Sequence, residues 1–219
     1  AFWKARNVLP HLSNLSAAVL MVGGWFDAED PYGPVAAYSE IERRQPGNSS
    51  TLVMGPWYHG GWTRSDGERL GDVDVDSSEA ARFFRLEVEL AFFDHHLRGA
   101  KSPGLPEALV FDTGTAQWRS LAAWPPVDVL PTAYHFRGNG LLDTDAPTGE
   151  AAFDEFPSDP ARPVPFSPWI EREWSYRFMT ADQRFAASRP DVLTYATEPL
   201  PEDLTVVGPV GAEFFVSTT

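Results

Sequence analysis

Two short apolar runs and one helical pattern of apolar residues organise the first part of the chain. The runs cover residues 17–23 (AAVLMVG) and 50–55 (STLVMG), and each has the length of a strand. Between them, residues 34–44 carry apolar side chains three residues apart, at positions 35, 38 and 41, a spacing typical of a helix. A strand, a helix and a second strand in this order predict a βαβ unit with parallel strands.

The clearest helical pattern lies at residues 76–98. Asp76 is a candidate N-cap, with Glu79 three residues later, and Gly99 is a candidate C-terminal cap. An apolar stripe, of the kind that packs on a core, runs along this segment. Its members are Phe83, Leu86, Leu90, Phe93 and Leu97.

The pattern changes after Pro103. Short β-rich runs recur, separated by turns rich in proline and glycine, at residues 108–114, 132–138, 193–199 and 204–218. This arrangement is typical of an antiparallel β-sandwich. We therefore predict an α/β domain over residues 1–102 and an all-β domain over residues 103–219.

Composition and charge narrow the classes of partner. The 219 residues carry a formal net charge of −14, which disfavours nucleic acid or an anionic membrane as a partner. The sequence has no cysteine, so disulfides and thiolate metal sites are excluded. No apolar run has the length of a transmembrane helix. Because the sequence begins without methionine and ends on what resembles a strand (EFFVSTT), we expect a fragment cut at both ends.

Candidate chemistry lies where the two predicted parallel strands end. The first strand leads into Gly-Trp-Phe-Asp27, and the second leads into Gly-Pro-Trp-Tyr-His59. Because functional groups collect at the carboxyl ends of strands in open α/β sheets, we expect this acid and this histidine to share one edge. Aspartate followed by histidine is also the chain order of the α/β-hydrolases. A solvated loop acid and a loop histidine bonded to backbone are the alternatives for each residue alone.

The sequence contains no motif for the nucleophilic serine of such a site. No G-x-S-x-G occurs in the sequence, and residues 47–51 (GNSST) lack the second glycine and precede a strand. In α/β-hydrolases the serine lies upstream of the acid, which here places it before Ala1. These residues therefore carry at most the second and third members of a Ser-Asp-His triad.

Longer motifs point to one family. GGWFDAEDPYGP and MGPWYHGGW resemble the α-amino acid ester hydrolases, within the wider family of X-Pro dipeptidyl peptidases, cocaine esterase and glutaryl-7-ACA acylase-like proteins. The resemblance continues through FFDHHLRG and QWRSLAAWPP, and resumes in RPDVLTYATEPLPEDLTVVGPV. It covers nearly the whole chain.

The resemblance implies the last part of an α/β-hydrolase core followed by an incomplete jelly-roll β-sandwich. It implies that Asp27 is the triad acid, that His59 is the triad base, and that Glu29 and Asp30 bind the α-ammonium group of a substrate. The implied reaction is acyl transfer from an ester or amide of an α-amino acid, such as a β-lactam antibiotic acyl compound, with no cofactor. A periplasmic or secreted location is also implied, and a homo-oligomer is compatible with the resemblance.

Other interpretations stay open. The enzyme is alternatively an X-Pro dipeptidyl peptidase or a general esterase of the same family. Carboxylates at positions 27, 29 and 30, or at positions 72, 74 and 76, are alternatively ligands of calcium, although solvated acids fit the pattern better. A non-catalytic sandwich that binds carbohydrate is a third class, with stacking by tryptophans at positions 118, 124, 169 and 174.

Overall fold

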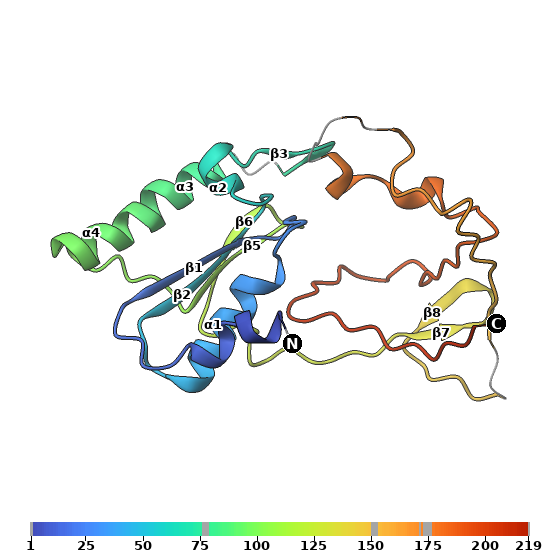
Figure 1. Ribbon diagram of the computed structural model, residues 1–219, viewed down its shortest axis with the longest axis horizontal. Coiled ribbons are helices and arrows are strands. Elements are labelled where there is room, and N and C mark those ends of the chain that lie inside the picture. The colour runs from blue at the N-terminus through green and yellow to red at the C-terminus, as the bar shows by residue number, and fades with distance from the viewer. Residues whose placement is uncertain (1, 76–78, 150–152, 171, 173–176, 219) are drawn as a thin grey trace. The chain divides into compact units, whose positions relative to one another are not determined.

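The computed structural model describes residues 2–75, 79–149, 153–170, 172 and 177–218. The chain forms two compact units (Figure 1). The first comprises residues 1–68, 75–129 and 205–219, and the second comprises residues 69–74 and 130–204. The first unit therefore contains both the candidate acid and the candidate histidine.

A four-stranded sheet forms the centre of the first unit. Its order is β1 (Val19–Gly24), β2 (Ser50–Gly55), β5 (Ala108–Asp112) and β6 (Gln117–Leu121). The first three strands are parallel, and β6 runs antiparallel to β5. All six residues of β2 are buried, as expected for a parallel strand covered on both faces. The two strands of the predicted βαβ unit are thus confirmed.

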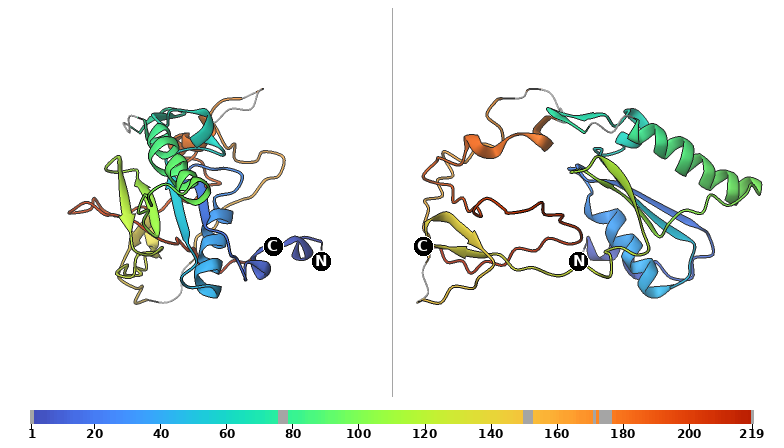
Figure 2. Two further views of the ribbon diagram at one scale, coloured as in Figure 1. Left: turned by 90° about the vertical axis from the view of Figure 1, so that its left-hand side faces the viewer. Right: turned by 180° about the vertical axis from the view of Figure 1, so that it is seen from behind.

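Helices cover both faces of this sheet (Figure 2). Leu52 and Met54 pack with Tyr38 of α1 (Tyr32–Arg44), which confirms the helix predicted over residues 34–44. Val53 points to the opposite face, where it packs with Phe84 of the second helical region. The first unit also contains the short helices η1 (Lys4–Arg6), η2 (Leu9–His11) and α2 (Gly61–Arg64).

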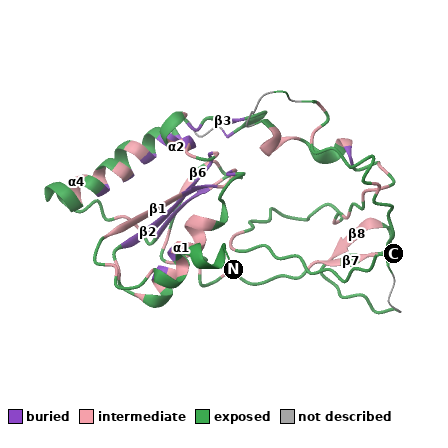
Figure 3. Cartoon of the chain, in the orientation of Figure 1, coloured by how far each residue is buried: buried purple, intermediate pink, exposed green. Residues whose placement is uncertain are grey.

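The second helical region differs from the prediction in its start and in its buried face. It consists of α3 (Ala80–Phe83), a π-helical segment η3 (Phe84–Glu89) and α4 (Leu90–Arg98). The predicted cap, Asp76, lies outside the described residues, whereas Gly99 ends the helix at φ 71° as predicted. The buried positions are Ala80, Ala81, Phe84, Val88 and Phe92. Figure 3 colours the chain by burial and shows buried and exposed positions alternating along this helix.

The predicted apolar stripe of this helix is exposed instead. Its members have exposed fractions of 38% (Phe83), 44% (Leu86), 48% (Leu90), 47% (Phe93) and 75% (Leu97). Both sets of residues satisfy a helical spacing, because the helix is apolar on two sides. The spacing alone therefore did not determine which side packs on the sheet.

The strands after Pro103 also differ from the prediction. The run at 108–114 was expected in the sandwich, but β5 pairs with β2 and extends the α/β sheet. The reason is visible in its sequence: Ala-Leu-Val-Phe is apolar at consecutive positions and buried at all four, as in a strand with covered faces. The predicted division at residue 102 stays a prediction.

The second unit contains short β elements. The strands β3 (Arg69–Leu70) and β4 (Val73–Asp74) pair antiparallel, and so do β7 (His135–Arg137) and β8 (Leu141–Asp143) around the turn η4 (Gly138–Gly140). Two single-turn helices, η5 (Arg177–Thr180) and η6 (Gln183–Phe185), follow.

The expected sandwich strands are only partly present. The run at 193–199 contributes one isolated bridge, Leu141 to Ala196, and the described residues 204–218 contain no strand. The fold is therefore α/β plus β, and the jelly roll stays a prediction. Among the described residues, no helix combines the length and the apolar character needed to cross a membrane.

A partly buried carboxylate on α1 leads to a stability prediction. Burial raises the pKa of Glu42, the negative charge of Glu107 raises it further, and one oxygen of Glu42 is buried without a described hydrogen-bond partner. Because the folded state holds this proton more tightly than the unfolded state, stability falls as the pH rises through the raised pKa. We expect Glu42→Gln to raise the melting temperature at pH 8 and to leave it nearly unchanged at pH 4.

Glu40 on the same helix provides the control. It pairs with Arg43 and Arg44, and these bonds lower its pKa to about 2. Glu40→Gln should therefore not raise the melting temperature at pH 8. Thermal unfolding of both variants at both pH values checks the prediction, and an equal response of the two variants would contradict it.

Candidate active site

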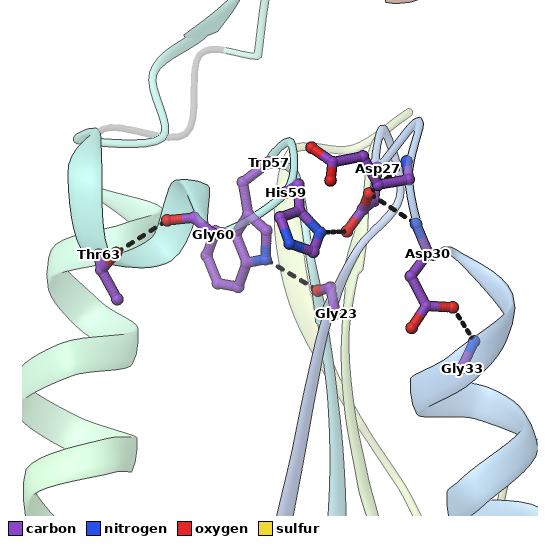
Figure 4. Close-up of polar contacts among 9 residues, drawn as sticks. Gly23, Asp27, Asp30, Gly33, Trp57, His59, Gly60 and Thr63 are labelled. Carbon is purple, nitrogen blue, oxygen red and sulfur yellow. Dashed lines mark hydrogen bonds and ion pairs between the residues drawn. The ribbon is translucent and has the colours of Figure 1, made fainter. Parts of the chain in front are cut away.

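The carboxyl ends of β1 and β2 bring Asp27 and His59 into contact. The Oδ2 atom of Asp27 lies 2.9 Å from Nδ1 of His59 (Figure 4). The register of the two strands explains this contact, because their last paired residues are Gly24 and Gly55, and the two loops leave the sheet side by side. The juxtaposition predicted from the strand ends is thus present in the structure.

Asp27 is held as a buried carboxylate. Its side chain is only 3% exposed, and its second oxygen, Oδ1, accepts hydrogen bonds from the backbone N–H groups of Glu29 (2.8 Å) and Asp30 (2.9 Å). Burial alone would raise the pKa of Asp27, but the N–H groups of Asp30 and Glu29 and the ring of His59 outweigh it and lower that pKa. Asp27 is therefore ionised at neutral pH.

The ring of His59 combines this anchor with access to solvent. Its side chain is 47% exposed. The hydrogen bond that the ring donates to Asp27 and the negative charge of that carboxylate raise the pKa of His59; Glu29 adds to the rise and Arg64 opposes it. Because an ionised carboxylate can only accept, Nδ1 is the protonated nitrogen, and Nε2 is left to take up a proton.

The three clustered carboxylates turn in different directions. Oδ1 of Asp30 accepts a hydrogen bond from the N–H of Gly33 (2.7 Å), so Asp30 caps the first turn of α1 (Figure 4). The resemblance implies an ammonium-binding role for Asp30, but one of its two oxygens, Oδ1, already has this structural partner. Glu29 is exposed. Backbone N–H groups therefore compensate much of the negative charge that the sequence concentrates here.

Neither metal alternative finds support among the described residues. No described group of three Asp, Glu or His residues is placed to hold a metal ion. In the second acidic run, Asp72 forms an ion pair with Arg177 (3.1 Å), and Asp76 lies outside the described residues.

The tryptophans proposed for carbohydrate stacking are engaged in packing. Trp118 packs against Phe111 and Trp57, and Trp124 packs against Trp25. The ring of Trp169 is covered by the guanidinium of Arg177 at 3.9 Å. The fourth, Trp174, lies outside the described residues. Packing within the protein is therefore what the structure shows for the three of these tryptophans that it describes.

Sequence patterns did not reveal two tryptophan contacts that join the end of β1 to the segment after β2 and to β5. The indole N–H of Trp57 donates to the carbonyl of Gly23 (2.8 Å), and the indole N–H of Trp25 donates to the carbonyl of Phe111 (2.8 Å). The sequence did contain a signal for these contacts, because several glycines flank both tryptophans. A large ring that packs against backbone needs neighbours without a side chain.

An ionised aspartate bonded to a solvent-accessible histidine is the arrangement that the acid and the base have in a serine hydrolase site. Comparison with known proteins agrees with this class. The profile described as X-Pro dipeptidyl-peptidase (S15 family) matches residues 1–61, and that described as X-Pro dipeptidyl-peptidase C-terminal non-catalytic domain matches residues 102–219. The chain belongs to the X-Pro dipeptidyl-peptidase family, which also includes cocaine esterase.

Curated relatives are esterases. The chain is similar to the cocaine esterase of Rhodococcus sp. (strain MB1 Bresler), with 30% identity over 232 residues, 99% of this chain and 38% of that protein. It is 28% identical over 208 residues to a putative serine esterase of Mycobacterium bovis, covering 93% of this chain and 31% of the relative. The chain thus spans about a third of the length of the curated relatives it matches.

Two solved structures share the fold. One is an aminopeptidase from the marine sediment archaeon Thaumarchaeota archaeon, with a TM-score of 0.85, 34% identity, and coverage of 92% of this chain and 34% of that chain. The other is an α-amino acid ester hydrolase labelled with selenomethionine, with a TM-score of 0.84, 34% identity, and coverage of 95% and 36%. Each is a hydrolase by name, as the site geometry suggests.

The contact between Asp27 and His59 yields a prediction about proton affinity. Because the raised pKa of His59 depends mainly on the Asp27 carboxylate, Asp27→Asn should lower it towards the ordinary histidine value. Titration of the histidine ring nitrogens by NMR measures the change, and His135, far along the chain in β7, serves as the internal control. An unchanged His59 titration would show that the two side chains are not bonded in solution.

Proposed function

We propose that this chain supplies the acid and the base of a serine hydrolase that cleaves esters or amides of α-amino acids. The observation that carries the proposal is the 2.9 Å contact between the Asp27 carboxylate and Nδ1 of His59 at the carboxyl ends of adjacent parallel strands. The family to which the chain belongs, and the names of its relatives, support the same reaction class.

In this proposal the nucleophilic serine lies outside these 219 residues. His59 accepts the serine proton at Nε2 while the hydroxyl oxygen attacks the substrate carbonyl. The imidazolium then donates that proton to the leaving alcohol or amine, and the Asp27 carboxylate stabilises its positive charge. Water or an amine, such as a β-lactam nucleus, accepts the acyl group in the second half of the reaction.

Glu29 is the residue that favours substrates with a free α-amino group. Its carboxylate is exposed and close enough to His59 for its charge to raise the pKa of that ring. A hydrogen bond between a carboxylate and an ammonium contributes about 1.5–3 kcal/mol. The similarity to an α-amino acid ester hydrolase and to an aminopeptidase supports this preference.

A general esterase is the second candidate, because the chain is 30% identical to a cocaine esterase over 99% of its length. Both candidates use the same acid and base. They differ in whether Glu29 contacts the substrate, so a substitution at this position separates them.

We expect Glu29→Gln in the intact enzyme to raise KM for an α-amino ester about 10-fold or more, and to leave KM for the des-amino analogue nearly unchanged. The matched control is Asp30→Ala, which removes the cap of α1 and should cost about 1 kcal/mol of stability without discriminating between the two esters. Steady-state kinetics with both substrates provide the test. Equal effects of Glu29→Gln on the two esters would favour the general esterase.

The location of the nucleophile is tested by covalent labelling. We expect a serine-directed fluorophosphonate to add once to the intact enzyme, on a peptide that lies outside residues 1–219. Because the serine needs its base, His59→Ala should abolish labelling. Peptide mass spectrometry locates the adduct, and an adduct on a serine of these residues would refute the upstream position.

A further inference from the structure

Trp57 connects the two strand ends that carry Asp27 and His59. It lies two residues before His59, and it is only 1% exposed. Its indole N–H donates to the carbonyl of Gly23 at 2.8 Å, and its own carbonyl accepts from the N–H of Phe26 at 3.3 Å. One residue of the histidine-bearing loop therefore bonds to the aspartate-bearing segment at two places, the second directly before Asp27.

The Trp57 ring is itself fixed by the core. It lies 5.6 Å from the ring of Phe84, 5.8 Å from that of Trp118 and 6.1 Å from that of Trp62, measured between centroids. These rings come from the helix η3, the strand β6 and the helix α2, so three elements restrict its position. Figure 4 shows the indole directed at Gly23 and the His59 ring directed at Asp27.

Glycines make room for this arrangement. A Cβ atom at Gly24 would lie 2.0 Å from the carbonyl oxygen of Trp57, and one at Gly55 would lie 2.3 Å from its ring. A Cβ at Gly61 would lie 2.7 Å from the Cβ of Trp57. Two strand ends and the start of α2 thus lack side chains at the points where Trp57 makes its closest approaches.

Asp27 has separate restraints on its side chain. Its Oδ1 is held by two backbone N–H groups of its own loop, which orient the carboxylate within that loop. Those bonds do not set the distance between the loop and His59. The two bonds of Trp57 contribute to that distance, because they join the histidine-bearing loop to Gly23 at the end of β1 and to Phe26 beside Asp27.

From this geometry we infer that Trp57 is a positioning residue, whose indole N–H fixes the distance between the Asp27 carboxylate and the His59 ring. The effect of Trp57 on catalysis rests on the proposed function. Its effect on the contact between Asp27 and His59 can be measured without any enzyme activity. A change of this distance weakens the Asp27–His59 hydrogen bond, and misplacement of a catalytic group by about 1 Å can cost on the order of 100-fold in rate.

The test removes the donor and keeps the ring. In the intact protein, Trp57→Phe deletes the N–H, and benzothienylalanine at position 57 replaces it with sulfur at nearly unchanged volume, which guards against a variant that fails to fold. Trp118→Phe is the matched control, because it makes the same chemical change in the same aromatic cluster, and no described hydrogen bond joins Trp118 to β1.

The first readout is the titration of His59 by NMR. Asp27, Glu29 and Arg64 are the charged groups that act on this ring, and the substitutions leave all three in place. We expect both changes at position 57 to lower the pKa of His59 and Trp118→Phe to leave it unchanged. A merely structural role for Trp57 would give the same His59 titration in all three variants and would overturn the inference.

The second readout is kinetic. We expect the changes at position 57 to lower kcat about 10- to 100-fold with KM within about 2-fold, and to shift the acidic limb of the pH profile with the pKa of His59. Asp27→Asn separates this inference from the proposed function. If Asp27→Asn leaves hydrolysis intact, the proposed function fails, whereas a lower His59 pKa in the position 57 variants still supports the positioning role.

Discussion

The parallel pairing of β1 with β2 is the constraint on which the site depends. The register runs without interruption from Val19 opposite Ser50 to Gly24 opposite Gly55, so both strands end at the same level. Beyond that level, the N–H of Trp25 still donates to the carbonyl of Gly55 (3.0 Å). A shift of one residue would turn every side chain of β2 to the other face and would separate the acid from the histidine. The hydrophobic packing on both faces of the sheet fixes this register, and it thereby also determines the geometry of the contact between Asp27 and His59.

Most of the negative charge beyond the end of β1 is compensated by hydrogen bonds. Asp27, Glu29 and Asp30 would repel one another if they faced the same space. Instead, backbone N–H groups and the His59 ring take up the charge of Asp27, and the first turn of α1 takes up that of Asp30. Among the described residues, no hydrogen bond or ion pair engages the carboxylate of Glu29, in contrast to the other two. Two of the three acidic residues in this segment therefore serve to hold the loop and the start of α1 in place.

Sequence patterns predicted the parts of the site that depend on chain order. Strand ends, the spacing from Asp27 to His59 and the helix between them are local features, and the structure contains all of them. Patterns did not reveal which side of the helix at residues 80–98 would be buried, because both sides satisfy the periodicity. They also did not show that Asp30 caps α1, because a carboxylate before a helix suits a cap as well as a ligand. The buried side of a helix and the partner of a carboxylate both depend on which residues the fold brings next to them.

The separate tasks of these residues have an evolutionary consequence. The side chain of Asp27 holds the histidine and that of Asp30 holds a helix, so a change at either position carries a cost in structure. Glu29 contributes its backbone N–H to Asp27, a group that every residue except proline retains. Position 29 can therefore vary by single mutations while the acid–base pair stays intact. With the role proposed for Glu29, a lineage with this loop can change the molecules that it selects while it keeps the contact between Asp27 and His59.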